Sequence, residues 1–498
     1  MKSSTFLFAY AADFDILSFN QMKNVVVQTL TVNRNKYSKL GMVQFDTAPT
    51  KINITYFDDV QTFSAALTNN PPNPKIAAGS STTSNVLSVI SKFLANPTVP
   101  LESSMVVLLI KRWPDIDSDL THLEYSSITN KDIKIFTITS DNDFNQQFAS
   151  GIGSYIPLNS LSVNSNGHFL IGKYGQSLVQ AFQNLVSTPF SHSLALTSSF
   201  SSVFGVWNKT IGQLKVPHSE SSNVVNFTIT ISVEIPQSVI NSKLIQLIFY
   251  DSETTQKVVK LQSLKDTNFY IGTVQLKERS TYQVLFQASL NFVTIPMIRI
   301  WTKSKLSYYG SYVSLNNPMS SLETVDEYQG AALRMELLND CYTSHAASVI
   351  ITDCAGVISA KYDSIQNIQI DYIFTGNSTF PHYSFVPFFC DQISRTEENC
   401  VPGTLGKYNI QFVAGEFTVI RSFQCRPGVG KINSNCRNLD SNGNYYCNRN
   451  QLPYMRGPTG QVPDCLGHGH VEYEFSNSKA YVCICNKGYS GVSCETKV

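Results

Sequence analysis

The chain has 498 residues, with 37 Lys and Arg against 36 Asp and Glu, so its formal net charge is +1. This near-neutral balance excludes proteins that bind nucleic acid or membrane surfaces through a strongly basic face. Hydrophobic residues make up 42% of the chain, which excludes a disordered polymer. No apolar run approaches the ~18 residues of a membrane-spanning helix, and the length predicts several domains.

The first 187 residues alternate apolar strands with segments of helical periodicity. Strands are expected over 6–12, 40–45, 51–56, 104–110 and 133–138, and helices over 19–30, 59–67, 83–94 and 177–186. This alternation predicts a doubly wound α/β sheet. In such a sheet a ligand site lies outside the carboxyl ends of the strands.

The start of the chain has two interpretations. Lys2 and the run Phe6–Ala12, with its Ala9-Tyr-Ala11 sequence, also resemble a short signal peptide. We favour a strand, because this run leads directly into Asp13. Export would then require residues upstream of this chain, which would be a fragment or a shortened gene product.

Three motifs fall at the expected carboxyl ends of the strands. They are Asp13-Phe-Asp-Ile-Leu17, Gly79-Ser-Ser-Thr-Thr83 and Ile110-Lys-Arg-Trp113. Together with the Gly41–Phe45 strand, they resemble a von Willebrand factor A domain over residues 4–187. Such domains often bind Mg²⁺ through Asp-x-Ser-x-Ser, a loop Thr and a later Asp.

This chain departs from that ligand set. Asp13 is present, but Asp15 and Leu17 stand at the two Ser positions, Ser81 stands for Thr, and Arg112 stands for the last Asp. Mg²⁺ prefers oxygen ligands, and a guanidinium at short range repels it. We therefore expect no metal or cofactor here, and a salt bridge from Arg112 to Asp13 or Asp15 in its place.

The segment after this strand offers two further alternatives. Asp115–Asp119 resembles a calcium loop, but Leu120 and Ser126 stand where such a loop needs Gly and Glu. We therefore expect an acidic turn that caps a helix. Trp113 is either an exposed anchor for a partner or part of the core.

Residues 190 to 425 have the pattern of β-structure. The Ser/Thr-rich stretch Ser187–Ser202 predicts a domain boundary, so the first domain is expected to span 1–187. An immunoglobulin-like or fibronectin-like sandwich is expected over 203–315, and a second β module over 323–428. Neither contains a recognisable catalytic set, so we expect no enzymatic activity.

All eleven cysteines follow position 340. Such density favours disulfides in an oxidising compartment over zinc, although His468 and His470 lie beside Cys465. Four sequons also favour export and glycosylation, at Asn53, Asn208, Asn226 and Asn377.

The last cysteines resemble an epidermal-growth-factor-like module. Cys483-Ile-Cys485 and Cys494 have the spacing of its second half, while Val471 stands where its third cysteine belongs. The resemblance implies the pairs Cys465–Cys483 and Cys485–Cys494.

The remaining cysteines are assigned less directly, because spacing does not fix connectivity. Cys425 belongs to none of the pairs named at the end of this paragraph, and it is expected to be free or to pair with another chain. A cysteine-containing linker is expected over 429–460 and the module itself over 461–498. The tentative pairs are Cys341–Cys354, Cys390–Cys400 and Cys436–Cys447.

The expected fold is thus multidomain: an α/β doubly wound von Willebrand factor A-like domain, two β-sandwich-like modules and a small disulfide-rich module. This order resembles a nematode family of secreted proteins, some of which are linked to infection responses. The resemblance implies an extracellular binding or adhesion protein, with a role in innate immunity and a protein or glycan as partner. The alternatives are a structural matrix protein and an adhesion protein that depends on a divalent cation.

Overall fold

The computed structural model describes residues 4–33, 36–48, 52–79, 82–199, 203–219, 222–233, 244–251 and 256–303, and beyond them the strands named below. The chain divides into two compact units, each described by itself. The first unit contains residues 1–307, 338–365 and 396–423, and the second contains 308–337, 366–395 and 424–498.

The first unit begins with a six-stranded sheet in the order β3-β2-β1-β4-β5-β6. Its strands are parallel except for β3, which pairs antiparallel with β2 at the edge. The bounds are β1 Thr5–Ala11, β2 Lys39–Phe45, β3 Thr55–Phe57, β4 Met105–Leu109, β5 Lys134–Ser140 and β6 Phe169–Gly172. This is the predicted doubly wound sheet, and it is compatible with a von Willebrand factor A-like domain.

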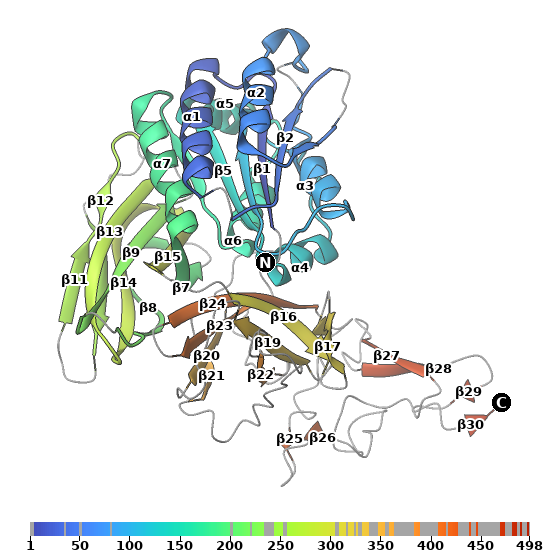
Figure 1. The fold of residues 1–498 in the computed structure, drawn as a ribbon, viewed down its shortest axis with the longest axis vertical. Helices are drawn as coiled ribbons and strands as arrows, with labels where there is room; N and C mark the ends of the chain where they lie inside the picture. The colour runs from blue at the N-terminus through green and yellow to red at the C-terminus, as the bar shows by residue number, and fades with distance from the viewer. Residues whose placement is uncertain are drawn as a thin grey trace. The chain divides into compact units, whose positions relative to one another are not determined.

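Helices cover both faces of this sheet (Figure 1). Helix α1 contacts α2 and α7, while α4 contacts both α3 and α6. The helices are α1 Ile16–Val32, α2 Val60–Asn69, η1 Pro74–Ile76 (a 3₁₀ turn), α3 Val86–Leu94, α4 His122–Asn130, α5 Asp141–Ser150, α6 Ile156–Asn164 and α7 Gln176–Ser191.

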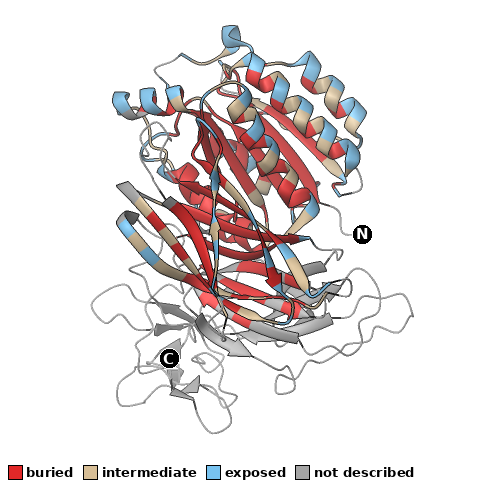
Figure 2. Ribbon diagram, turned by 90° about the vertical axis from the view of Figure 1, so that its left-hand side faces the viewer, coloured by how far each residue is buried: buried red, intermediate tan, exposed pale blue. Residues whose placement is uncertain are grey.

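The start of the chain forms the centre of this layer. All seven residues of β1 are buried, and this strand leads into Asp13 as the strand interpretation predicted. Figure 2 shows that buried residues dominate the strands of this layer. On α1, the apolar side chains at helical spacing face the sheet, and Phe19 packs against Phe8 and Tyr10. Each such buried side chain contributes about 1.5–3 kcal/mol.

Several elements were not predicted from the sequence. Helix α6 is buried from Pro157 to Asn164, so it lacks the one-sided apolar stripe by which a surface helix is recognised. Helix α5 is largely polar, and β6 has only four residues. The strand expected over 51–56 is in fact limited to Thr55–Phe57.

A β-sandwich follows in the same unit. One sheet has the order β11-β10-β14-β8 and the other β12-β13-β9-β15-β7. The strands are β7 His192–Ser199, β8 Val203–Lys215, β9 Val224–Val233, β10 Leu244–Tyr250, β11 Gln256–Lys260, β12 Gln262–Ser263, β13 Phe269–Lys277, β14 Thr281–Thr294 and β15 Pro296–Lys303. The alternating apolar residues of β9 are buried in its core, as the pattern predicted.

The predicted boundary stretch Ser187–Ser202 contains the change from the α/β layer to the sandwich, but its described residues, 187–199, are helix and strand. Helix α7 continues to Ser191, and β7 begins at the next residue and pairs with β15. Thr197, Ser198 and Ser199 of β7 are buried, and Thr197 donates to Asn166 of the α/β layer while Ser199 accepts from Arg299 of β15. The sandwich therefore begins well before residue 203.

Two further groups of strands are described. In the first unit, a sheet has the order β24-β23-β20-β21. Its strands are β20 Ala347–Asp353, β21 Ile358–Tyr362, β23 Lys407–Ala414 and β24 Phe417–Arg426. The second unit contains β16 Tyr308–Ser314, β17 Asn317–Leu322, β18 Val325–Asp326, β19 Ala331–Leu337 and β22 Tyr383–Phe388. The range 323–428, expected to form one β module, is therefore divided between the two units.

The cysteine-rich end contributes short strand pairs to the second unit. They are β25 Asn438–Leu439 with β26 Tyr445–Tyr446, β27 Gly469–Tyr473 with β28 Tyr481–Cys485, and β29 Tyr489–Ser490 with β30 Thr496–Lys497. Val471 lies opposite Cys483 in the β27–β28 pair. The side chains of all eleven cysteines lie outside the described residues, as does Asn377, so the disulfide pairs and the growth-factor-like module stay predictions.

Across the described residues, we find no helix with the length and apolar character needed to cross a membrane.

Candidate functional site

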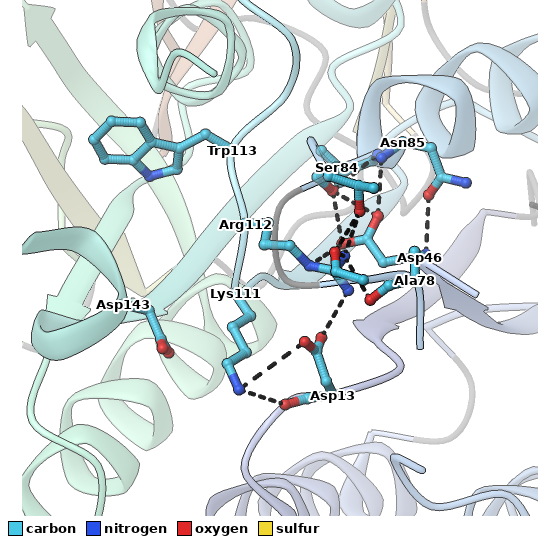
Figure 3. A network of polar contacts seen from close by, with 12 residues as sticks. Asp13, Asp46, Ala78, Ser84, Asn85, Lys111, Arg112, Trp113 and Asp143 are labelled. Carbon is cyan, nitrogen blue, oxygen red and sulfur yellow. Dashed lines mark hydrogen bonds and ion pairs between the residues drawn. The ribbon is translucent and has the colours of Figure 1, made fainter. Parts of the chain in front are cut away.

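The carboxyl ends of three neighbouring strands bring charged side chains together. Asp13 follows β1, Asp46 follows β2 and Arg112 follows β4, and these strands are adjacent in the sheet. Figure 3 shows Arg112 between the two carboxylates. This is the edge at which the fold predicts a ligand site.

Arg112 is almost completely buried, with 2% of its surface exposed. Its Nη2 donates to Asp13 Oδ1 at 3.2 Å, and its Nη1 donates to the carbonyls of Ala78 and Gly79 and to Thr82 Oγ1 at 2.8–3.1 Å. Of the two predicted pairings, the structure has the one with Asp13. The guanidinium thus connects the β1 loop to the loop before α3.

Asp46 is the second buried carboxylate. Both of its carboxylate oxygens lie 2.9 Å from Ser84 Oγ, whose hydroxyl donates to them, and Oδ1 accepts from the Asn85 amide at 2.9 Å. Asn85 Oδ1 accepts in turn from the Asp46 amide. Arg112 Nε lies 4.0 Å from Asp46 Oδ2. Burial raises the pKa of Asp46 to about 6, against the hydrogen bonds and the Arg112 charge, which lower it.

The other predicted positions have different environments. Asp15 caps α1 by accepting from the Ser18 amide, and the side chain of Leu17 is 72% exposed. Ser81 lies outside the described residues. Lys111 adds a second cation, with its Nζ donating to the Asp13 carbonyl at 3.3 Å.

Two of the carboxylates at this edge are already engaged by other groups. A metal at this edge needs several converging oxygen ligands, but the Asp13 carboxylate is engaged by Arg112 and Asp15 by its helix. A fixed cation also repels Mg²⁺ by several kcal/mol at short range. Among the described residues, no group of three or more His, Cys, Asp or Glu side chains is placed to hold a metal.

The structure also resolves the two alternatives for the segment after β4. Asp115 and Asp119 accept local hydrogen bonds in a turn, but the cap of α4 is Thr121, in a capping box with Glu124. The acidic turn therefore precedes the cap. Trp113 is buried against Phe144 and Tyr155 and points away from Arg112 (Figure 3).

Five of the large apolar side chains that are exposed follow or lie beside strand ends at the edge that carries Arg112. Ile16 and Leu17 follow β1, and Ile116, 69% exposed, follows β4. Ile76 is held beside the end of β2, because its carbonyl accepts from Ala48 and the neighbouring Ala78 amide donates to Asp46. Ile156 begins α6, next to a loop in which the Ser154 amide donates to Pro114. We call Ile16, Leu17, Ile76, Ile116 and Ile156 the apolar rim.

The sequence interpretation missed Asp46, Thr82, Ser84 and Asn85. Asp46 directly follows the predicted strand 40–45, so its position at the end of a parallel strand was a signal that could have revealed it. Its backbone has φ = 57°, a conformation that Asp and Asn tolerate better than most residues. Thr82 and Ser84 carried no signal beyond their place in a Gly-Ser/Thr loop.

We expect Asp46 to make the stability of the domain depend on pH. Its folded pKa of about 6 exceeds the ordinary 3.8, so the folded state holds the proton more tightly. Its stabilising contribution is present below pH 3.8 and is lost as the pH rises through 6. Asn tolerates the same φ, so D46N should remove this dependence, worth about 1–3 kcal/mol. Urea unfolding of both proteins between these pH values is the test, and a difference that does not change with pH would contradict it.

Comparisons with known proteins add little to this picture. No protein-family model matches the chain, and no curated protein is similar to it. Among solved structures, it is similar to a von Willebrand factor type A protein from Catenulispora acidiphila, with 7% identity and a TM-score of 0.24 over 68% of this chain. The chain spans 63% of the length of that structure.

Two further structures are similar at the same low level. The Bacillus licheniformis lipase BlEst2 in its propeptide form has 9% identity and a TM-score of 0.22, over 85% of this chain and 93% of the lipase. The pilus adhesin RrgA from Streptococcus pneumoniae has 7% identity and a TM-score of 0.18, over 97% of this chain and 78% of the adhesin. Likenesses this weak carry no argument about function. Strand order and site geometry place the first layer among doubly wound α/β domains compatible with the A-domain type.

Proposed function

We propose that this protein is a secreted or surface-attached, non-enzymatic binding protein. It recognises an extracellular protein partner through the apolar rim of the α/β layer, without a divalent cation. The observation that carries the proposal is Arg112, which stands at the position of an expected metal ligand and donates to Asp13. A role in adhesion or in innate immunity belongs to the same proposal.

The chemistry of the rim favours a protein partner over a glycan. Five large aliphatic side chains are exposed around a cluster whose charges are paired internally. Exposed aliphatic groups gain free energy by leaving water, at roughly 25 cal/mol per Å² of buried apolar surface. Clustered apolar exposure of this kind marks interaction sites.

The extracellular part of the proposal is supported by the sequons. Asn53, Asn208 and Asn226 are all exposed, as an acceptor for a glycan must be. Asn53 lies in the loop before β3, and the other two lie on strands β8 and β9 of the sandwich. The density of cysteines after position 340 agrees with an oxidising compartment.

A double substitution tests the binding surface. Charged L17E and I116E replacements in the rim should lower affinity for a bound partner by at least tenfold, or about 1.4 kcal/mol, because each carboxylate would lose its water at the interface. The purified chain would be screened against a panel of secreted and cell-surface ectodomains, in EDTA and in Mg²⁺. Binding constants of wild type and variant for each interacting ectodomain would then be compared.

Val32 provides a matched control. It ends α1, it is 83% exposed, and helix direction places it at the opposite edge of the sheet from Leu17. V32E should therefore leave binding unchanged. A partner bound only in Mg²⁺ would favour cation-dependent adhesion, and equal losses in V32E and the double variant would refute the rim as the binding surface.

A further inference from the structure

A buried polar layer separates the α/β sheet from the sandwich within the first unit. Arg299 of β15 lies between Thr197 of β7 and Thr230 of β9, in register with both. The neighbouring Ile298 and Ile300 face the sandwich core, so alternation along the strand turns Arg299 to the opposite face, toward the α/β layer.

Arg299 is fully buried and only partly satisfied. Its Nη1 donates to the Ser198 and Ile298 carbonyls and to Ser199 Oγ, at 3.0–3.2 Å. Its Nε and Nη2 are also buried, and neither has a hydrogen-bond partner among the described residues. Buried guanidinium nitrogens left in this state cost several kcal/mol.

Two further basic side chains flank Arg299. His168 lies on the Thr230 side, with Nε2 2.9 Å from Thr230 Oγ1 and Nδ1 2.8 Å from Ser232 Oγ. Lys407 lies on the Thr197 side, with Nζ donating at 2.7 Å to Asn166 Oδ1, an atom that also accepts from Thr197. Basic groups thus surround Arg299 along the layer.

The positive charge of this layer is not balanced by the described carboxylates. Arg421 is a useful contrast, because it is also buried but pairs with Asp132 at 2.8 Å. Neither Arg299 nor Lys407 has such an ion pair among the described residues. Burial lowers the pKa of Arg299 only to about 9, so Arg299 stays cationic at neutral pH. Burial also lowers the pKa values of His168 and Lys407, and the charge of Arg299 lowers them further.

We propose that this layer holds a small monovalent inorganic anion of halide size, bound by Nε and Nη2 of Arg299. The two nitrogens form the edge of a planar fork that is suited to an anion, and a halide accepts hydrogen bonds from any direction. A phosphate would bring several additional acceptor oxygens, and each of them would need its own donor in this buried layer. Chloride is the probe of choice, since it matches this chemistry.

The test compares stability in two salts of equal ionic strength. The full chain would be unfolded thermally in increasing sodium chloride, with sodium gluconate making up the remaining salt. An anion bound only in the folded state raises the melting temperature with concentration, because stabilisation grows as RT ln(1 + [L]/Kd). We expect a saturating rise in chloride and bromide, and bromide anomalous scattering beside Arg299 in crystals.

Two variants make the result specific. R299K keeps the charge but removes the fork, so it should lose the chloride dependence. K260Q removes an exposed cation from β11 and should keep that dependence in full. Equal melting temperatures in chloride and gluconate for the wild type, or an equal chloride effect in R299K, would overturn the proposal. If R299K does not fold, the bromide position in wild-type crystals decides.

Discussion

Replacing Arg112 with alanine is expected to lower the free energy of unfolding by about 3 kcal/mol. The variant would leave Asp13 with only the more distant Lys111 as a cation, Asp46 with an uncompensated buried charge, and the carbonyl of Ala78 without its Arg112 donor. Removing one partner of a buried ion pair costs more than the pair itself contributes, because the remaining charge stays out of water. Urea unfolding of the two proteins at neutral pH gives the difference.

R112K is the matched control for this change. It keeps a cation, but an ammonium group cannot donate to Asp13 and to the loop carbonyls at the same time. We therefore expect about half the loss in the free energy of unfolding. R112D is the sharper variant, since it gathers three carboxylates at the strand ends. It should be unstable in EDTA and be stabilised by millimolar Mg²⁺, whereas the wild type should not respond. An R112A protein as stable as the wild type would show that the guanidinium does not hold this edge together.

Replacing Asn268 with aspartate is expected to have an effect of similar or larger size. Asn268 is fully buried where the α/β sheet meets the sandwich. Its Nδ2 donates to the carbonyls of Phe169 and Val233, and its Oδ1 accepts from the Ile171 amide at 2.8 Å. The change to Asp keeps the shape but places a carboxylate oxygen against two carbonyls. We expect a loss of about 3–5 kcal/mol at neutral pH.

The pH dependence of N268D provides its own check. Protonation restores a donor, so the pKa of the new carboxyl in the folded state should be raised above its ordinary value. The loss should therefore shrink as the pH falls through that raised pKa. N223D makes the same chemical change at an exposed position before β9 and should cost less than about 0.5 kcal/mol. A loss of stability in N268D that is independent of pH would contradict the role assigned to Nδ2 of Asn268.

The α/β layer was largely predictable because its signals are local. Buried strands appear as apolar runs, and α1 displays its apolar stripe at the spacing of a helix. Helix α6 escaped prediction because it is buried all round, and β7 because its hydroxyl residues are typical of a linker. In both cases the burial depends on segments distant in the chain, which no local pattern records.

The candidate site was also predictable in large part from the sequence. The order of the motifs placed Asp13 and Arg112 at one edge, and opposite charges at short range favour pairing. Sequence left the choice between Asp13 and Asp15 open. Asp15 is unavailable to Arg112 because it accepts from the amide of Ser18 and begins α1.

The sequence by itself determined that the first layer is a doubly wound sheet and that a cation stands at the position of an expected metal ligand. Both follow from residue type and from spacing along the chain. Only the tertiary structure decided that Asp46 joins the site and that two nitrogens of the buried Arg299 find no partner among the residues that the structure describes. Those facts depend on strand register and on the packing of the sandwich against the α/β layer. Contacts between residues more than a hundred positions apart, such as Lys407 with Asn166, are made by folding and leave no pattern in the neighbouring sequence.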